Sequence, residues 1–309
     1  MSHHPALKIT PLAPHIGVDV QGVTIDELLV DDDLFSEIQR ALHKHIVLRF
    51  AGHEISPQAI TDFMAKFGPP MDIRAGKGAV HVPGHDFIQV LSGAKDAQGR
   101  LLGDDNTSQQ IWHTDAGQWE VPPGVVFLYG RVIPEPPPGT YFKNMIKVYD
   151  SLPDDLKKKI ADLRAIHHMY ARSVDVEVHR NGPTQPSAVR KAGPAHPLVR
   201  RQLSTGKAAL YLPTRRDSVI VGLSDEESKA LLTQLWNIVE ASPFDLKCPI
   251  GIGDLLLWDN MAAVHARDGW SPELRRDVWH LLAEGESPTP MYPRKTSNPN
   301  VLGQASPAY

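Results

Sequence analysis

Ile111-Trp112-His113-Thr114-Asp115 is the segment from which the fold and the chemistry of this chain can be inferred. Successive side chains of a β-strand point to opposite faces, so His113 and Asp115 project from one face if this segment is a strand. Two such side chains can bind one metal ion together. A distant histidine as third ligand would complete the facial triad that leaves three coordination positions of iron(II) open.

The other closely spaced histidines fit metal binding less well, although the chain has 15 of them and a His-x-Asp sequence arises easily by chance. His43 and His45 lie in a predicted helix, where residues two positions apart point in different directions. His81 and His85 are separated by Pro83 and Gly84, which break the helix that would align them. His167 and His168 are adjacent, so their side chains point apart. His113 and Asp115 therefore remain the best candidate pair.

The composition is typical of a soluble globular protein with a proper core. Hydrophobic residues make up 41% and charged residues 22% of the chain. The formal net charge is -4, with both signs interspersed, so no basic stripe for nucleic acid is expected. Residues 1–14 lack the apolar core of a signal peptide, and no apolar run approaches the ~20 residues that span a bilayer.

The single cysteine, Cys248, excludes an intrachain disulfide framework and a thiolate zinc cluster. This usage is typical of a reducing compartment, so we expect a cytoplasmic protein without membrane or nucleic-acid partners.

Short apolar stretches bounded by turn residues predict a mostly β core. Two peripheral helices are predicted, over 33–45 from apolar residues at helical spacing and over 56–67 before Gly68 and Pro69. Ser151 and Ser224 each begin a capping-box pattern ahead of a further helix. The predicted strands include residues 125–129, 209–212, 255–258 and 278–282.

We expect one domain over residues 1–309, with a loop-rich insert at about 130–205 and a short C-terminal tail at 285–309. Two segments rich in proline and glycine, 132–139 and 181–197, are predicted to lack regular structure.

The order of several further motifs resembles the TauD/TfdA (taurine dioxygenase-like) family of 2-oxoglutarate-dependent dioxygenases. Each motif is weak alone, but their order and spacing from about residue 7 to 283 are specific. They are Ile9-Thr-Pro-Leu12, Ile16-Gly17, Phe67-Gly68, Trp112-His-Thr-Asp115, Gly139-Thr140, Gly206-Lys-Ala-Ala-Leu-Tyr211, Trp258-Asp-Asn260, His265 and Arg275-Arg276.

The resemblance implies a double-stranded β-helix, a jelly-roll core with peripheral helices, that holds iron(II) on His113, Asp115 and His265. It also implies that Arg276 and Thr140 bind the distal carboxylate of the co-substrate 2-oxoglutarate. A guanidinium suits that role because its planar fork matches a carboxylate and keeps its charge. Residues 258–260 are expected to shape the turn that leads to His265. Family members often form homo-oligomers.

The activity that the resemblance implies is oxidative decarboxylation of 2-oxoglutarate with O2, followed by oxidation of a small-molecule substrate. The 2-oxoglutarate and O2 would fill the three open positions on the iron. Related halogenases have a small residue in place of Asp115, so its presence here favours a hydroxylase or an oxidative-cleavage enzyme.

The substrate pocket departs from the pattern of the sulfonate-using members. Their second arginine, fifteen residues after the distal histidine, is matched here by His280, which cannot grip an anion with a bidentate fork. Family asparagines are matched by Gln109 and Pro213, and Arg215 or Arg275 could supply the missing charge. The substrate is therefore expected to differ from taurine, as an aromatic or natural-product-like molecule would, and to be covered by loops near 74–85 and 181–197.

Two alternatives stay open at this point. One is an Fe(II) oxygenase or lyase of the same fold that does not use 2-oxoglutarate. The other is a non-catalytic metal-binding barrel, which is less favoured because a structural site is normally closed by a fourth ligand.

Overall fold

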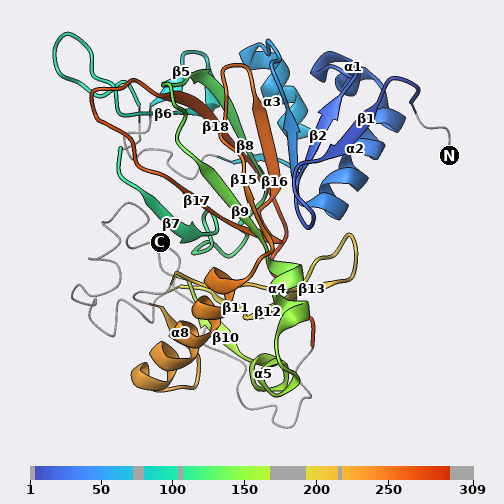
Figure 1. The fold of residues 1–309 in the computed structure, drawn as a ribbon, viewed down its shortest axis with the longest axis vertical. Helices are drawn as coiled ribbons and strands as arrows, with labels where there is room; N and C mark the ends of the chain where they lie inside the picture. The colour runs from blue at the N-terminus through green and yellow to red at the C-terminus, as the bar shows by residue number, and fades with distance from the viewer. Residues whose placement is uncertain (1–3, 72–79, 104–106, 168–192, 215–217, 293–309) are drawn as a thin grey trace.

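The backbone of the computed structural model is mainly β, with few helices (Figure 1). The structure describes residues 4–71, 80–103, 107–167, 193–214 and 218–292. The predicted strands are confirmed, because each short apolar stretch singled out in the sequence contributes to a strand.

The largest sheet runs in the order β1-β2-β3-β16-β8-β18-β6-β5, and β4 also pairs with β18. Its members are β1 (Lys8–Pro11), β2 (Val18–Gln21), β3 (Val47–Phe50), β4 (Pro70–Met71), β5 (His81–Val82), β6 (His85–Ser92), β8 (Pro123–Val132), β16 (Leu255–Asp259) and β18 (Asp277–Glu284). A second sheet has the order β15-β9-β17-β7. Its members are β15 (Asp245–Lys247), β9 (Thr140–Asn144), β17 (Ala263–Arg267) and β7 (Gln110–His113).

The central strands of the large sheet are covered on both faces, which explains their uninterrupted apolar sequences. In β16, Leu256 and Trp258 pack in a core cluster with Phe142 and Ala263 of the second sheet. The alternate residues of β16 point the other way, into a cluster that includes the helices near the N-terminus. The second sheet therefore lies against one face of β16, and helices lie against the other.

The N-terminal helices cover the outer face of the large sheet. They are α1 (Ile25–Val30), α2 (Asp32–His45) and α3 (Pro57–Ala65), drawn in blue in Figure 1. Leu28, Ile38 and Phe63 insert from these helices into the same cluster as Leu255 and Leu257. The two predicted N-terminal helices are confirmed to within two residues at each end.

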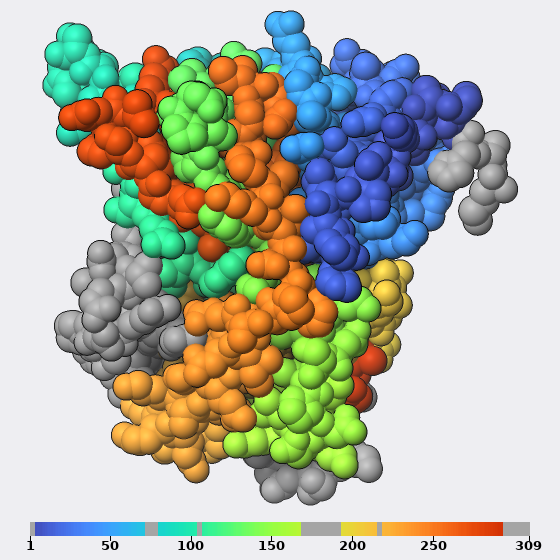
Figure 2. Space-filling view, viewed as in Figure 1, coloured from blue at the N-terminus to red at the C-terminus, as the bar shows by residue number. Residues whose placement is uncertain are grey.

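A third group of elements lies below the two sheets in Figures 1 and 2. Its helices and strands share a core cluster of their own, which also includes Val264 of β17. The group consists of α4 (Met145–Ser151), α5 (Asp154–Ile160), α8 (Asp225–Ala241), β10 (Arg164–Ile166), β11 (Ala195–Pro197), β12 (Val199–Arg201), β13 (Ala208–Leu210) and β14 (Val219–Ile220).

Two sequence expectations in this group were wrong, and one was confirmed. Ser151 ends α4, and its hydroxyl donates to the Val148 carbonyl, so it does not cap α5. The segment 181–197 includes the strand β11, although residues 181–192 lie outside the described residues. Ser224 does form the predicted capping box, with Glu227.

The segment 130–205, expected to be loop-rich, also carries β9 to β12 and the helices α4 and α5 in its described part. None of the described helices is both long and apolar enough to pass through a bilayer.

Phe63, in α3, lies at the centre of a cluster of aromatic side chains, and its replacement by alanine should destabilise the fold. Its ring is buried. The ring centroid lies 5.3 Å from that of Phe67 and 6.1–6.3 Å from the centroids of Phe35, Phe50 and Phe127. We expect Phe63→Ala to lower the free energy of unfolding by about 3–5 kcal/mol, because it removes buried area and leaves a cavity.

Urea denaturation followed by circular dichroism measures this change, and Phe87→Ala is the control because Phe87 is 39% exposed. Equal urea midpoints for the two variants would contradict the assignment of Phe63 to the core.

Candidate metal centre

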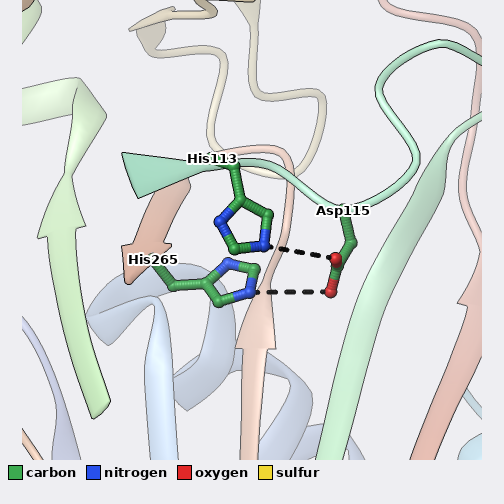
Figure 3. A group of neighbouring side chains, drawn as sticks. All are labelled: His113, Asp115 and His265. Carbon is green, nitrogen blue, oxygen red and sulfur yellow. Dashed lines mark ion pairs between the residues drawn. The ribbon is translucent and has the colours of Figure 1, made fainter. Parts of the chain in front are cut away.

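His113, Asp115 and His265 come together between the two strands β7 and β17 (Figure 3). The strands are antiparallel, and His113 lies directly opposite His265. Asp115 Oδ1 is 3.6 Å from His113 Nε2, and Asp115 Oδ2 is 3.7 Å from His265 Nε2. All three side chains are buried. The structure thus brings together the three residues that the sequence singled out.

The geometry of Asp115 differs in one respect from the expectation. The strand β7 ends at His113, and Asp115 lies in the turn that follows rather than in the strand. Its carboxylate still faces the two imidazoles, as Figure 3 shows. Ala116, which comes next, has a φ of 49°, a backbone conformation that residues other than glycine rarely adopt.

Asn260 holds the Asp115 turn in place. Its side-chain oxygen accepts a hydrogen bond from the Asp115 amide at 3.1 Å, and its Nδ2 donates to the carbonyls of Asp115 and Pro123 at 3.0 and 2.9 Å. Asn260 is fully buried. The motif at 258–260 was expected to shape the turn before His265. Its asparagine also fixes the turn of another metal-ligand candidate, 145 residues earlier in the chain.

Asp259 fixes the other end of this motif. One oxygen of its carboxylate accepts from the Met261 amide, and the other accepts from Gln202 Nε2 at 2.6 Å. The turn between β16 and β17 is therefore held by side chains on both sides.

The charge at the centre is compatible with a divalent cation. Burial alone would raise the pKa of the Asp115 carboxyl, but the surrounding histidines His265, His113 and His280 lower it well below its usual value. The carboxylate is therefore ionised, although a buried charge is costly without compensation. One donor atom from each of His113, Asp115 and His265 lies within 4.8 Å of the others. Two imidazole nitrogens and one carboxylate oxygen are the donor set of non-haem iron(II) sites.

Thr140 lies on β9, next to β17, and Arg276 immediately precedes β18. Arg276 is 1% exposed, and its guanidinium lies over the ring of Trp270 at 5.1 Å. Thr140, the first residue of β9, is buried, and its hydroxyl has no hydrogen-bond partner within the part of the chain that the structure describes. A hydroxyl and a guanidinium buried in this way are donors suited to an anionic ligand.

Asp277, the acidic residue next to Arg276 in the chain, is held by other partners. It accepts a hydrogen bond of 2.5 Å from Ser92 and forms an ion pair with Arg275. Arg275 was one candidate to replace the second, anion-binding arginine of the sulfonate-using members. Its charge is instead paired with that of Asp277. Arg267 was missed by sequence reasoning: it is buried, and its guanidinium lies over the Trp270 ring at 4.4 Å.

The candidate substrate residues fall in three different situations. His280, in β18, is buried, and its Nε2 lies 3.3 Å from Asp115 Oδ2. Gln109 is exposed and immediately precedes β7. Arg215 lies outside the described residues, as do most of the two loops expected to cover the site.

A cluster of buried polar rings beside the Asp115 turn was not predicted. His167 stacks on Tyr211 with ring centroids 4.6 Å apart, and His196 lies 5.3 Å from His167. A Cβ atom on Gly117 would come within 2.6 Å of His167 Nδ1, so only glycine permits this approach. Tyr211 belongs to a motif noted in the sequence, but nothing in that motif indicates which rings it meets.

Comparison with known proteins supports these observations. Residues 8–282 match the family described as "Taurine catabolism dioxygenase TauD, TfdA family". Pentalenolactone F synthase of Streptomyces avermitilis is 30% identical over 297 residues, which cover 90% of this chain and 94% of that protein. The (S)-phenoxypropionate/alpha-ketoglutarate-dioxygenase of Sphingobium herbicidovorans is 27% identical, over 91% of this chain and 96% of that protein.

A solved structure gives the same result for the fold. A taurine dioxygenase from Burkholderia xenovorans superimposes with a TM-score of 0.72 at 26% identity, over 92% of this chain and 93% of that one. The family match spans nearly the whole length between β1 and β18, including all three residues of the metal centre and Arg276. The chain therefore belongs to the TauD/TfdA family of dioxygenases.

Proposed function

We propose that this chain is a non-haem Fe(II)- and 2-oxoglutarate-dependent dioxygenase that oxidises a small organic molecule other than taurine. Family membership gives the class of enzyme. The observation that carries the residue assignment is the buried group of His113 and His265, on two paired strands, and Asp115, in the turn after β7, together with the buried Arg276 just before β18.

His113, Asp115 and His265 would hold the iron. Bound iron(II) supplies the site at which O2 is activated as 2-oxoglutarate is oxidatively decarboxylated. The protein contributes a rigid and dry setting: Asn260 fixes the Asp115 turn, and the β7–β17 pairing fixes the two histidines. Among the residues that the structure describes, three would bind the metal, which leaves room for 2-oxoglutarate and O2.

Arg276 and Thr140 would bind the distal carboxylate of 2-oxoglutarate. The Arg276 guanidinium is buried, so it is shielded from bulk water. A carboxylate that binds to it there interacts with it more strongly than it would in water. The stack on Trp270 limits the orientations of the guanidinium.

Gln109, His280 and Arg215 are proposed to border the substrate. A sulfonate needs a charged and bidentate partner, and His280 offers neither a fork nor a permanent charge. Two relatives are named for pentalenolactone F and for (S)-phenoxypropionate rather than for a sulfonate. We therefore propose an aromatic or natural-product-like substrate.

The finer features of the fold follow the same proposal. The two sheets would be the walls of a double-stranded β-helix, the jelly roll, within one domain over residues 1–309. We further propose a cytoplasmic homo-oligomer that does not bind nucleic acid, in line with the formal net charge of -4.

Replacing any residue of the triad should abolish turnover and weaken metal binding. We expect His113→Ala, Asp115→Ala and His265→Ala each to lose stoichiometric Fe(II), since two ligands hold a divalent ion far less tightly than three. Anaerobic titration and metal analysis of the purified proteins measure this loss. His15→Ala is the control, because His15 is exposed on a loop. Full iron occupancy in His265→Ala would show that the third ligand is misassigned.

Arg276→Ala should raise the KM for 2-oxoglutarate by roughly tenfold to 100-fold. The reason is that a charged hydrogen bond contributes about 1.5–3 kcal/mol. Arg275→Ala is the matched control, since the Arg275 side chain is 58% exposed and pairs with Asp277 instead. Steady-state oxygen uptake measures the KM for 2-oxoglutarate of both variants. Uptake that continues without any 2-oxoglutarate would instead favour an oxygenase of the same fold that does not use it.

Taurine and related alkyl sulfonates should be poor substrates, because no bidentate cation replaces the second arginine at position 280. Oxygen uptake with iron(II), 2-oxoglutarate and a panel of sulfonates, phenoxy acids and lactones tests this expectation. Efficient and saturable turnover of any alkyl sulfonate would refute it.

A further inference from the structure

His280 makes two contacts that its expected place beside the substrate does not explain. It lies in β18 directly opposite Gln89 of β6, and its Nδ1 is 3.1 Å from Gln89 Oε1. On the other side of the ring, Nε2 is 3.3 Å from Asp115 Oδ2. Asp115, His280 and Gln89 are all less than 9% exposed, so these polar groups meet one another away from bulk water.

His280 does not belong to the ligand set itself. Within the described residues, the group whose donor atoms could share one ion consists of His113, Asp115 and His265. His280 approaches the carboxylate of Asp115 instead. A residue that contacts a metal ligand without reaching the metal acts on the orientation of that ligand.

The direction of the hydrogen bonds follows from the chemistry of the three groups. An ionised carboxylate only accepts, so the ring must present Nε2–H to Asp115. At Nδ1 the partner is the Gln89 side-chain amide, whose oxygen accepts from an N–H and whose NH2, after a half-turn of the amide, donates to a lone pair. In either orientation Gln89 fixes the direction in which the His280 ring points.

We propose that His280 is a positioning residue for Asp115 and that Gln89 in turn positions His280. This inference rests on the proposed iron site. A hydrogen bond to Oδ2 restrains rotation of the carboxylate and leaves Oδ1 as the oxygen for the metal. A carboxylate that binds through one oxygen keeps open the positions that 2-oxoglutarate and O2 require.

The same contacts determine what His280 does toward the substrate. Both ring nitrogens have partners within the protein, so neither is available for a substrate anion. The residue that stands where sulfonate-using members carry an arginine is thus turned toward the metal ligand. We infer that the substrate presents a neutral surface on this side of the site.

The test compares two substitutions that differ in one donor group. His280→Gln keeps an N–H group near the position of Nε2, whereas His280→Leu removes it at similar volume. Isothermal titration of the full-length apoprotein with Co(II), without substrate or O2, should give about 10- to 100-fold weaker binding for His280→Leu. His280→Gln should stay within a few-fold of the wild type. The visible spectrum of the bound Co(II) should change in His280→Leu alone.

Gln89→Leu is the second variant, and it should weaken Co(II) binding in the same direction but less, because the imidazole remains. His45→Leu is the control, since His45 is a half-buried histidine at the end of α2 and is not part of the triad. Thermal unfolding checks that each protein is folded. Should His280→Leu fail to fold, Gln89→Leu decides: Co(II) affinity equal to that of His45→Leu would overturn the inference.

The outcome also separates this inference from the proposed iron site. If His280→Gln and His280→Leu bind Co(II) equally, the positioning role is wrong even where the triad substitutions abolish binding. If His265→Ala and Asp115→Ala bind Co(II) as the wild type does, the iron site itself is wrong.

Discussion

The antiparallel pairing of β7 with β17 places His113 opposite His265, and the rest of the centre is built around that pair. Backbone hydrogen bonds of a sheet fix the distance between facing residues, and the His113 ring is also held by a 2.6 Å contact of its Nδ1 with the Ile111 carbonyl. Asp115 lies beyond the end of β7 and does need support, which Asn260 provides through the backbone of the turn. The strands thus place two ligand candidates, and a buried amide places the third.

The balance of charge within the centre follows from burial. An ionised carboxylate away from water is costly unless donors surround it, and here three histidine side chains do so. At Arg276 the problem is reversed, because this residue is a buried cation stacked on Trp270. These two groups give the site a negative end suited to a metal ion and a positive end suited to a carboxylate. The negative charge comes from the turn after β7, and the positive charge comes from the end of the segment that joins β17 to β18 and also carries Trp270.

Much of this arrangement could be predicted from the sequence, because it depends on short-range spacing or on an ordered set of motifs. The triad, the buried strands and the capping box at Ser224 are of this kind. Contacts between distant segments could not be predicted: Asn260 and His280 reach Asp115 across 145 and 165 residues. The capping box predicted at Ser151 was wrong for a different reason. This serine is the last residue of α4, so its hydroxyl bonds back to Val148.

The covering of β16 on both faces has a consequence for how such a protein can diverge. A residue in a strand of this kind is constrained by neighbours above and below, so substitutions there are removed by selection whatever the substrate. Connecting segments carry no such double constraint. Evolution can therefore exchange the surfaces that recognise a substrate while the oxidising centre stays intact. Relatives named for pentalenolactone F and for (S)-phenoxypropionate can then share about a quarter to a third of their residues with this chain.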